Sequence, residues 1–293
     1  MLLIILVYIL DILLWGSTWV AIKIGLESLG PFTSATARFV LGFIVLALAF
    51  RIWRFRFPRQ PRLRRDVFIT GLVMYGINFS LLYWAQQYLN ASTAAVLFSS
   101  MPFFVALCAQ RMLPNEKMSP RSVIGMLLGL AGTLVLFSRD LDFSGPALAM
   151  LAVLVSSFWV SWATVKIKRD LEIISPTMLA TLQLPPGILL MAVGMFAFEL
   201  PLEFEISARS VGSVLYLAIA GTGAAFIGWY WILKRISATA ASLMTFIEPV
   251  VATVLAVLIL HETLSSRFVG GAALILIGVL LVVLKRRTPV RPL

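Results

Sequence analysis

Three ionisable residues, Asp11, Arg38 and Glu248, lie inside long apolar stretches of the sequence. Charged side chains are costly at membrane depth, so they are candidates for transport or proton relay if those stretches span a bilayer. Glu248 directly precedes Pro249. A carboxylate there could carry a proton, and the proline leaves a backbone carbonyl unpaired that could help to bind substrate. The alternative is that Glu248 is a structural partner of a basic or amide group.

The other two ionisable residues have more than one interpretation. Asp11 could pair with Arg38, share a proton pathway with Glu248, or face a cytoplasmic vestibule. Arg38 could hold a substrate carboxylate through two hydrogen bonds. It could instead act as an internal counter-ion or extend to the outer interface. We assign all three residues to charge or proton coupling.

Two pairs of tryptophans have helical spacing. Trp15 and Trp19 are four residues apart and Trp159 and Trp162 are three apart, so each pair shares one helix face. If a two-fold axis relates the two halves of the chain, the pairs face each other as an aromatic wall for apolar, aromatic or cationic solutes. An interfacial aromatic belt is the alternative. The predicted substrate cavity combines these four with Ser17, Asn78, Trp84, Ser99, Gln183 and Tyr230, and Gln86 is a weaker polar candidate.

Four prolines within apolar stretches mark predicted helix breaks or hinges. Proline removes a backbone donor and crowds the preceding turn. Pro185 and Pro186 are adjacent and are expected to bend or break their helix, as a gate or hinge would. Pro102 and Pro249 are the other two predicted breaks, and Met101 precedes the first of them.

The composition of the chain indicates that these residues lie in membrane-spanning helices. The chain has 293 residues, of which 60% are hydrophobic and 13% charged. A soluble domain has about 25% charged residues, so an ordinary soluble enzyme is excluded. A bilayer crossing needs roughly 20 apolar residues. We therefore predict an all-α membrane protein with ten transmembrane helices, at about 2–22, 31–50, 67–88, 91–112, 121–137, 146–165, 174–197, 209–232, 237–260 and 266–285.

The basic residues are distributed unequally between the two sides of these helices. If the N-terminus is cytoplasmic, 19 of the 24 Lys and Arg residues fall on the inner side and four on the outer side, with Arg38 inside a span. This bias predicts that both termini are cytoplasmic. The arginine-rich segment 51–65 is then a topology anchor that also attracts anionic lipid. The net charge of +11 therefore indicates a lipid bilayer as partner and not nucleic acid.

The sequence contains an internal repeat. Residues 92–137 align without gaps to residues 238–283, and 15 of the 46 pairs are identical. Biased composition alone would give about four or five. We predict two repeats of five helices each, at 1–137 and 146–285. Because five is odd, the second repeat enters the membrane from the opposite side, as in alternating-access transporters.

Several short segments resemble a known family, the EamA family of the drug/metabolite transporter superfamily. They are residues 14–23 with Pro31 and 37–39, residues 94–102 with Glu116 and Gly125, and residues 248–250 with Glu262 and Gly271. The resemblance implies ten helices in two inverted halves and export of small metabolites, amino acids or drugs across a bacterial inner membrane. It further implies proton coupling and a functional monomer. Asp11 departs from the family, which usually has an apolar residue there, and Met101 stands before Pro102 where Glu248 stands before Pro249.

Other classes of function lack the residues they need. His261 is the one histidine, so a His-rich metal site and a membrane-embedded Ser/His/Asp set are not expected. No Walker loop is present, and an intramembrane aspartyl protease would need a second Asp in a span. We predict a secondary transporter for a small-molecule substrate, without cofactor, metal or enzymatic activity. A passive facilitator or channel is the alternative, and a lipid-handling membrane enzyme is a weaker one.

Overall fold

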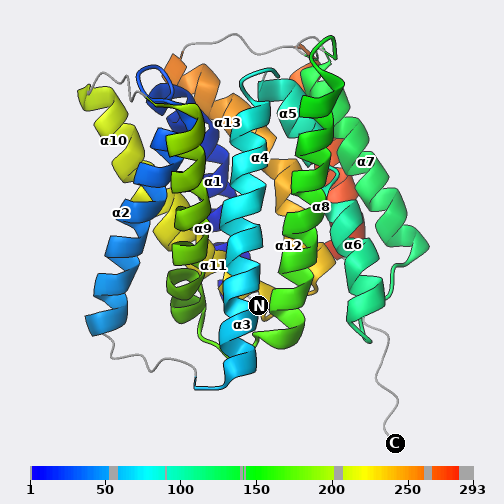
Figure 1. Ribbon diagram of the computed structural model, residues 1–293. Helices are drawn as coiled ribbons and strands as arrows, with labels where there is room; N and C mark the ends of the chain where they lie inside the picture. Colours follow the sequence, from blue (N-terminus) through cyan, green and yellow to red (C-terminus); the bar gives the residue numbers. More distant parts are fainter. Residues whose placement is uncertain are drawn as a thin grey trace, which may run out of the picture.

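The computed structural model describes residues 2–52, 59–89, 91–138, 141, 143–200, 207–260 and 266–283. Regular structure within these residues is entirely helical, and the helices stand side by side as a bundle (Figure 1). In chain order they are α1 (Leu2–Gly25), α2 (Pro31–Ile52), α3 (Pro61–Gly71), η1 (Leu72–Ile77), α4 (Asn78–Ala85), α5 (Ala91–Phe98), α6 (Met101–Met112), α7 (Pro120–Phe137), α8 (Ala147–Asp170), α9 (Pro176–Phe198), α10 (Ala208–Tyr216), η2 (Leu217–Ala224), α11 (Ala225–Leu233), α12 (Ala238–Ser242), α13 (Met244–Leu260) and α14 (Ser266–Val283).

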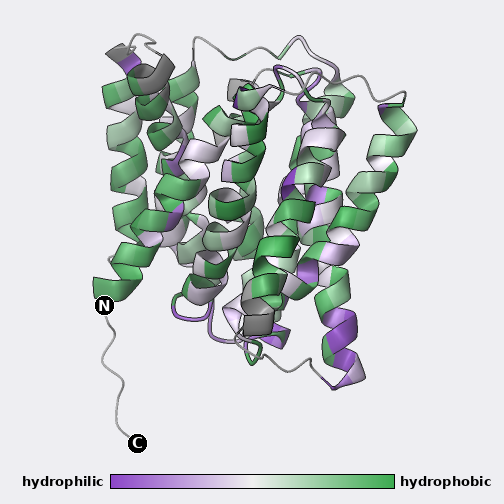
Figure 2. Ribbon diagram, turned by 90° about the vertical axis from the view of Figure 1, so that its left-hand side faces the viewer, coloured by the Kyte–Doolittle hydropathy of each residue, from purple (hydrophilic) through white to green (hydrophobic). Residues whose placement is uncertain are grey.

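Nine helical stretches in the described part of the chain are long and apolar enough to cross a membrane. Four of them combine consecutive elements, such as α3, η1 and α4 in Pro61–Ala85. The tenth predicted span corresponds to α14, whose apolar part, Arg267–Val283, is shorter than the other nine. Figure 2 shows hydrophobic residues along most of the helical surface, with hydrophilic residues at the ends of the bundle and at a few places inside it. This distribution is what a bilayer-embedded bundle requires.

Serine and proline set the helix starts. Ser119, Ser175, Ser207 and Ser237 each accept a hydrogen bond from the backbone amide three residues later, and so cap α7, α9, α10 and α12. Such a cap satisfies an amide that the helix cannot pair internally. Pro61 in the first turn of α3 has a fixed φ suited to helix entry. For this reason α3 begins six residues before the predicted start at 67.

Of the four prolines at predicted helix breaks, Pro102 lies next to an interruption, and the other three lie inside continuous helices. The fourth span is interrupted at Ser99 and Ser100, directly before α6, which has Pro102 in its first turn. Pro249 lies within α13, and the corresponding interruption comes earlier, at Leu243. Helix α9 continues through Pro185 and Pro186.

Two π-helical segments, η1 and η2, interrupt the third and eighth spans. A π-helical segment widens the helix locally and is frequent at functional sites. η1 packs against α9, where Gly187 approaches Tyr75 so closely that a Cβ there would clash. η2 packs against α2, where a Cβ on Gly42 would lie 2.9 Å from the Thr222 side chain. Each wide turn thus contacts the helix that carries a predicted functional residue, Gln183 or Arg38.

Helices α7 and α14 meet at glycines. A Cβ on Gly125 would lie 2.6 Å from the Gly278 carbonyl, and a Cβ on Gly132 would lie 2.7 Å from the Gly271 carbonyl. Small residues allow two helix backbones to approach closely in a membrane. Because Gly125 meets Gly278 and Gly132 meets Gly271, the two helices run antiparallel.

Candidate functional site

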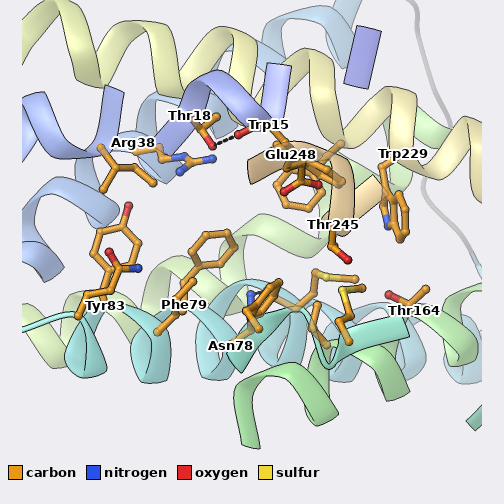
Figure 3. Close-up of a pocket in the computed structure, with 18 residues that line it drawn as sticks. Trp15, Thr18, Arg38, Asn78, Phe79, Tyr83, Thr164, Trp229, Thr245 and Glu248 are labelled. Carbon is orange, nitrogen blue, oxygen red and sulfur yellow. Dashed lines mark hydrogen bonds between the residues drawn. The ribbon is translucent and has the colours of Figure 1, made fainter. Parts of the chain in front are cut away.

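A cavity lies between helices of both parts of the chain, and we call it the central cavity (Figure 3). Its volume is about 110 Å³, smaller than the roughly 300–1,000 Å³ of typical small-molecule sites. The structure therefore has room for a small solute or part of a larger one. The residues that line it are Trp15, Thr18, Ile22, Arg38, Met74, Asn78, Phe79, Leu82, Tyr83, Gln86, Phe98, Met101, Val160, Thr164, Phe226, Trp229, Thr245 and Glu248.

The first carboxylate, Glu248, lines the central cavity from α13. Its residue is 9% exposed, and its buried Oε1 atom has no hydrogen-bond partner. Helix α1 passes close to Glu248 at Gly16. A Cβ on Gly16 would lie 3.1 Å from the Glu248 carbonyl oxygen and 2.7 Å from Val251, so the close approach depends on the absence of a side chain there. An unsatisfied buried carboxylate costs free energy, so its retention at a cavity wall points to a ligand or a proton.

Asp11 is the second carboxylate without a partner. It is 1% exposed, and neither carboxylate oxygen has a hydrogen-bond partner. Asp11 is not among the residues that line the central cavity. Its side chain lies against Gly228 of α11, where any Cβ would collide with the carboxylate. The glycine is the reason that α1 and α11 can enclose an acidic side chain.

Arg38 is held by the wide turn η2. Its Nε donates to the Thr222 hydroxyl at 2.9 Å and its Nη2 donates to the Gly221 carbonyl at 3.2 Å. The guanidinium also lies 5.3 Å from the ring centroid of Phe39 and 5.6 Å from that of Phe79. These contacts replace the predicted ion pair with Asp11, whose oxygens are unpartnered. Arg38 is 2% exposed and still lines the cavity.

Trp15 is the predicted aromatic residue that does line the cavity. Its indole nitrogen donates to the Gly221 carbonyl at 3.3 Å, and its ring lies 5.3 Å from Phe226 and 5.5 Å from Trp229. These rings come from α1 and α11, so the aromatic wall joins the first and eighth spans. The side chain of Trp19 lies outside the described residues.

The second tryptophan pair lies elsewhere. Trp159 and Trp162 contact each other edge to face at 5.8 Å on α8, and Trp159 is 37% exposed. Neither lines the central cavity, so the structure does not bring the two predicted pairs face to face. Helix α8 presents the residues Val160 and Thr164 to the cavity instead.

Gln183 and Tyr230 form a polar chain away from the cavity. The Tyr230 hydroxyl donates to Gln183 Oε1 at 2.5 Å, and Gln183 Nε2 donates to the Thr70 hydroxyl at 2.6 Å. The hydroxyls of Tyr75 and Tyr230 are 3.1 Å apart. This chain joins η1 and α3 to α9 and α11, and therefore ties early and late helices together.

The remaining predicted residues have local partners. Ser17 donates to the Leu14 carbonyl of its own helix and contacts the Tyr216 hydroxyl, and Ser99 donates to the Ala95 carbonyl of the preceding helix, α5. Trp84 packs on Tyr88 with ring centroids 5.2 Å apart. None of these three lines the cavity, whereas Asn78 does. Asn78 Oδ1 accepts from Ser156 at 2.7 Å, which links α4 to α8.

Sequence reasoning missed several lining residues. Thr18, Thr164 and Thr245 line the cavity, as do Met74 and Phe79. Threonine and methionine are common in apolar spans, so no local signal separated these from ordinary packing. Thr18 had the best available signal, because it lies three residues after Trp15 and shares its helix face.

A cluster of ion pairs lies at one end of the bundle. Lys166 Nζ lies 3.2 Å from Asp66 and 2.8 Å from Asp170, which ties α3 to α8. Lys168 Nζ donates to the carbonyls of Leu233 and Ile236, at 2.6 Å each. The Lys166–Asp170 pair also extends α8 beyond its predicted end at 165, because charges four residues apart support the last turn.

At the other end, a single carboxylate joins α9 to α2. Glu199 accepts from the Phe32 amide at 2.6 Å and the Thr33 amide at 2.8 Å, and so caps the start of α2. Gln86, which directly follows α4 at the same end of the bundle, lines the cavity.

Among the described residues, no group of three or more His, Cys, Asp or Glu side chains could hold a metal ion.

The protein is a multi-pass helical bundle, and its polar and aromatic cavity is lined by helices from both the early and the late part of the sequence. This is the architecture of a membrane transporter. The model of the EamA-like transporter family matches the sequence twice, over residues 2–138 and 147–284. The chain belongs to this family, and it is a membrane transporter.

Curated relatives agree over nearly the whole length. "Uncharacterized transporter YoaV" of Bacillus subtilis (strain 168) is 31% identical over 270 residues, which cover 91% of this chain and 92% of the relative. "Uncharacterized inner membrane transporter YedA" of Escherichia coli (strain K12) is 30% identical over 286 residues, which cover 96% and 90%. A crystal structure at 24% sequence identity aligns with a TM-score of 0.82 and covers 95% of this chain and 96% of that chain. This last likeness shows the fold.

Proposed function

We propose that this transporter is a proton-coupled secondary exporter of small organic solutes, which binds its substrate in the central cavity. The observation that carries the proposal is the buried Glu248 carboxylate, whose Oε1 has no partner although it lies at the cavity wall. Ionisable residues inside membrane spans commonly serve proton relays or substrate pathways. Asp11 is the second proposed proton site, and Arg38 is the proposed anchor for an anionic group of the substrate.

We further propose that the transporter consists of ten spans in two inverted halves, 1–137 and 146–285. The aligned repeat pairs Gly125 with Gly271 and Gly132 with Gly278. In the structure Gly125 approaches Gly278, the counterpart of Gly132, and Gly132 approaches Gly271, the counterpart of Gly125. A two-fold axis produces this reciprocal pattern. The two matches of the family model and the positions of η1 and η2 also support two equivalent halves. Five spans per half then place the halves in opposite orientation.

Alternating access requires a closed and an open end. In this proposal the ion pairs of Lys166 and the Gln183–Tyr230–Tyr75 chain close the cytoplasmic end. Their partners come from both halves, so opening this end must break them. The 19-to-4 distribution of basic residues supports cytoplasmic termini on the same side.

The proposed location is the bacterial inner membrane, and the proposed functional unit is the monomer. The name of the inner membrane relative from Escherichia coli supports the location. The cavity lies within one chain, so one copy suffices to form it. Small metabolites, amino acids and drugs are the proposed substrate classes.

Uphill transport tests the proposal against a passive facilitator. A growth-resistance panel of toxic amino-acid analogues and drugs, in cells with and without the protein, identifies a substrate. The purified protein in liposomes should then accumulate that solute against its gradient when a pH gradient is imposed, and accumulation should stop when an ionophore collapses the gradient. Transport that only equilibrates the solute would contradict the proposed coupling.

A further inference from the structure

A second hollow lies on the outer surface of the bundle, between α2, α3 and α9. Its volume is about 710 Å³, larger than that of the central cavity. Phe43, Phe68 and Leu189 contribute apolar walls, and Pro185 forms part of its lining on α9. Phe68 is 53% exposed and Leu189 is 66% exposed, so the groove opens toward the surroundings of the protein. In a membrane those surroundings are lipid chains.

On α9 the groove extends over about two helical turns. On α9 its lining runs from Leu182 to Leu189, which lie six and 13 residues after the helix start at Pro176. At 1.5 Å per residue these positions are about 9 and 20 Å along the helix. Half of the hydrocarbon core is about 15 Å thick. With Pro176 at the membrane surface, the α9 part of the lining would begin about 9 Å deep and reach the region of the midplane.

Two arginines lie at the shallow end of the groove. Arg64 and Arg65 are in the first turns of α3 and both line it. The Arg65 side chain is 68% exposed and its Nη2 lies 3.5 Å from Asp66, a carboxylate that also pairs with Lys166 at 3.2 Å. Arg62 lies 4.0 Å from the same acid, and Lys166 also pairs with Asp170 at 2.8 Å. Because the cations around these two acids outnumber them, the mouth of the groove carries a net positive charge.

We propose that this groove binds an anionic phospholipid, with its phosphate at Arg64 and Arg65 and an acyl chain along Phe43, Phe68 and Leu189. The positive mouth matches the phosphate, since arginine binds phosphate through paired hydrogen bonds. The apolar wall matches one chain of one leaflet. The bound chain contacts α9 at Pro185, where proline leaves the preceding turn short of a backbone hydrogen bond. Occupancy should therefore stabilise α9 and α3 together.

Lipid-dependent unfolding temperatures test the proposal. The purified chain in neutral detergent is heated with added phosphatidylglycerol, phosphatidylcholine or inorganic phosphate. Phosphatidylglycerol should raise the midpoint by several degrees more than phosphatidylcholine, because a ligand that binds only the folded state stabilises it. An equal rise with both lipids would overturn the proposal, and so would an equal rise with inorganic phosphate, which lacks the chain.

Matched variants locate the effect. The double variant R64Q/R65Q should lose the extra rise with phosphatidylglycerol. The double variant R59Q/R121Q removes the same charge from exposed positions outside the groove lining and outside the Asp66 ion pairs, and it should keep the rise. L189W should also lose the rise, because it fills the groove and leaves both arginines in place. Loss of the rise in both double variants would show diffuse attraction to a basic surface and would overturn the site.

Discussion

The central cavity and the end of the bundle that carries the Lys166 ion pairs, the proposed closed end, differ in whether their buried charged side chains have partners. In and behind the cavity, Glu248 and Asp11 have buried oxygens with neither a hydrogen bond nor an ion pair. The Asp66 Oδ1 atom also lacks a hydrogen bond, but it lies within ion-pair distance of Lys166 and Arg65. At the closed end, Lys166 is shared between Asp66 and Asp170, which lie 3.2 and 2.8 Å from its Nζ. Paired charges hold a structure closed, whereas unpaired ones remain available to a proton or a ligand. The comparison separates residues that stabilise the fold from residues for which we propose a role in transport, and each of the following variants tests one side.

The largest effect is expected from Lys166→Met at the closed end. The Asp66 side chain is 2% exposed and keeps Arg65 at 3.5 Å in the variant, so the loss should lie toward the lower end of the about 3–5 kcal/mol that removing one partner of a buried pair costs. The unfolding midpoint in detergent should fall clearly, and Asp66→Asn added to Lys166→Met should recover part of it. A midpoint equal to that of the wild type would show that the ion pairs do not hold this end.

A smaller loss is expected where α7 and α14 meet. Gly271→Ala places a Cβ 2.8 Å from the Gly132 carbonyl and 2.9 Å from the Leu136 amide, and overpacking of this kind costs about 1–3 kcal/mol. Gly270→Ala is the matched control on the same helix, because a Cβ there meets nothing within 4 Å. Thermal unfolding should separate the two neighbours. Equal midpoints would contradict close backbone contact between these helices.

Gly228→Ala tests the pocket that holds Asp11. The new Cβ collides with the Asp11 carboxylate, so the single variant should unfold at a lower temperature, by an amount in the lower part of the same range. Asp11→Ala removes the obstruction, and the double variant should recover the loss. Equal losses in the single and double variants would show that Asp11 does not lie against α11.

The smallest stability effect is expected from Glu248→Gln. An unpartnered carboxylate contributes no ion pair to the folded state, so its neutral isostere should leave the free energy of unfolding unchanged or raise it by up to about 1 kcal/mol, with an unchanged or slightly higher midpoint. A loss as large as that of Lys166→Met would mean that Glu248 has a structural partner, and the contrast between the two regions would fail.

The helical fold could be predicted from the sequence because the physical signals are local. Apolar length identifies spans, and Ser175 with Pro176 identifies a helix start. The interruption at Leu243 instead of Pro249 could not be predicted, since proline is tolerated in a helix when neighbouring helices satisfy the freed carbonyl. The π-helical segments also have no local sequence signal.

The site could be predicted only in part. Four predicted residues line the central cavity: Glu248, Arg38, Trp15 and Asn78. They were expected there because polar side chains are costly inside a membrane or, for Trp15, because of its helical spacing. Trp159 was assigned by analogy with Trp15, but the rotation of a helix about its axis depends on packing against its neighbours. The partners of Arg38 lie 183 and 184 residues further along the chain, and no local pattern reports a contact of that range.

The most direct test of the proposed coupling is transport by Glu248→Gln in liposomes, once a substrate is known. Glu27→Gln is the control, because it makes the same change at a half-exposed residue that pairs with Arg209 outside the cavity. The account predicts that Glu248→Gln keeps downhill exchange of the solute but loses accumulation driven by a pH gradient, while Glu27→Gln retains both. Undiminished accumulation by Glu248→Gln, with unchanged pH dependence, would contradict the assignment of this carboxylate as the proton carrier.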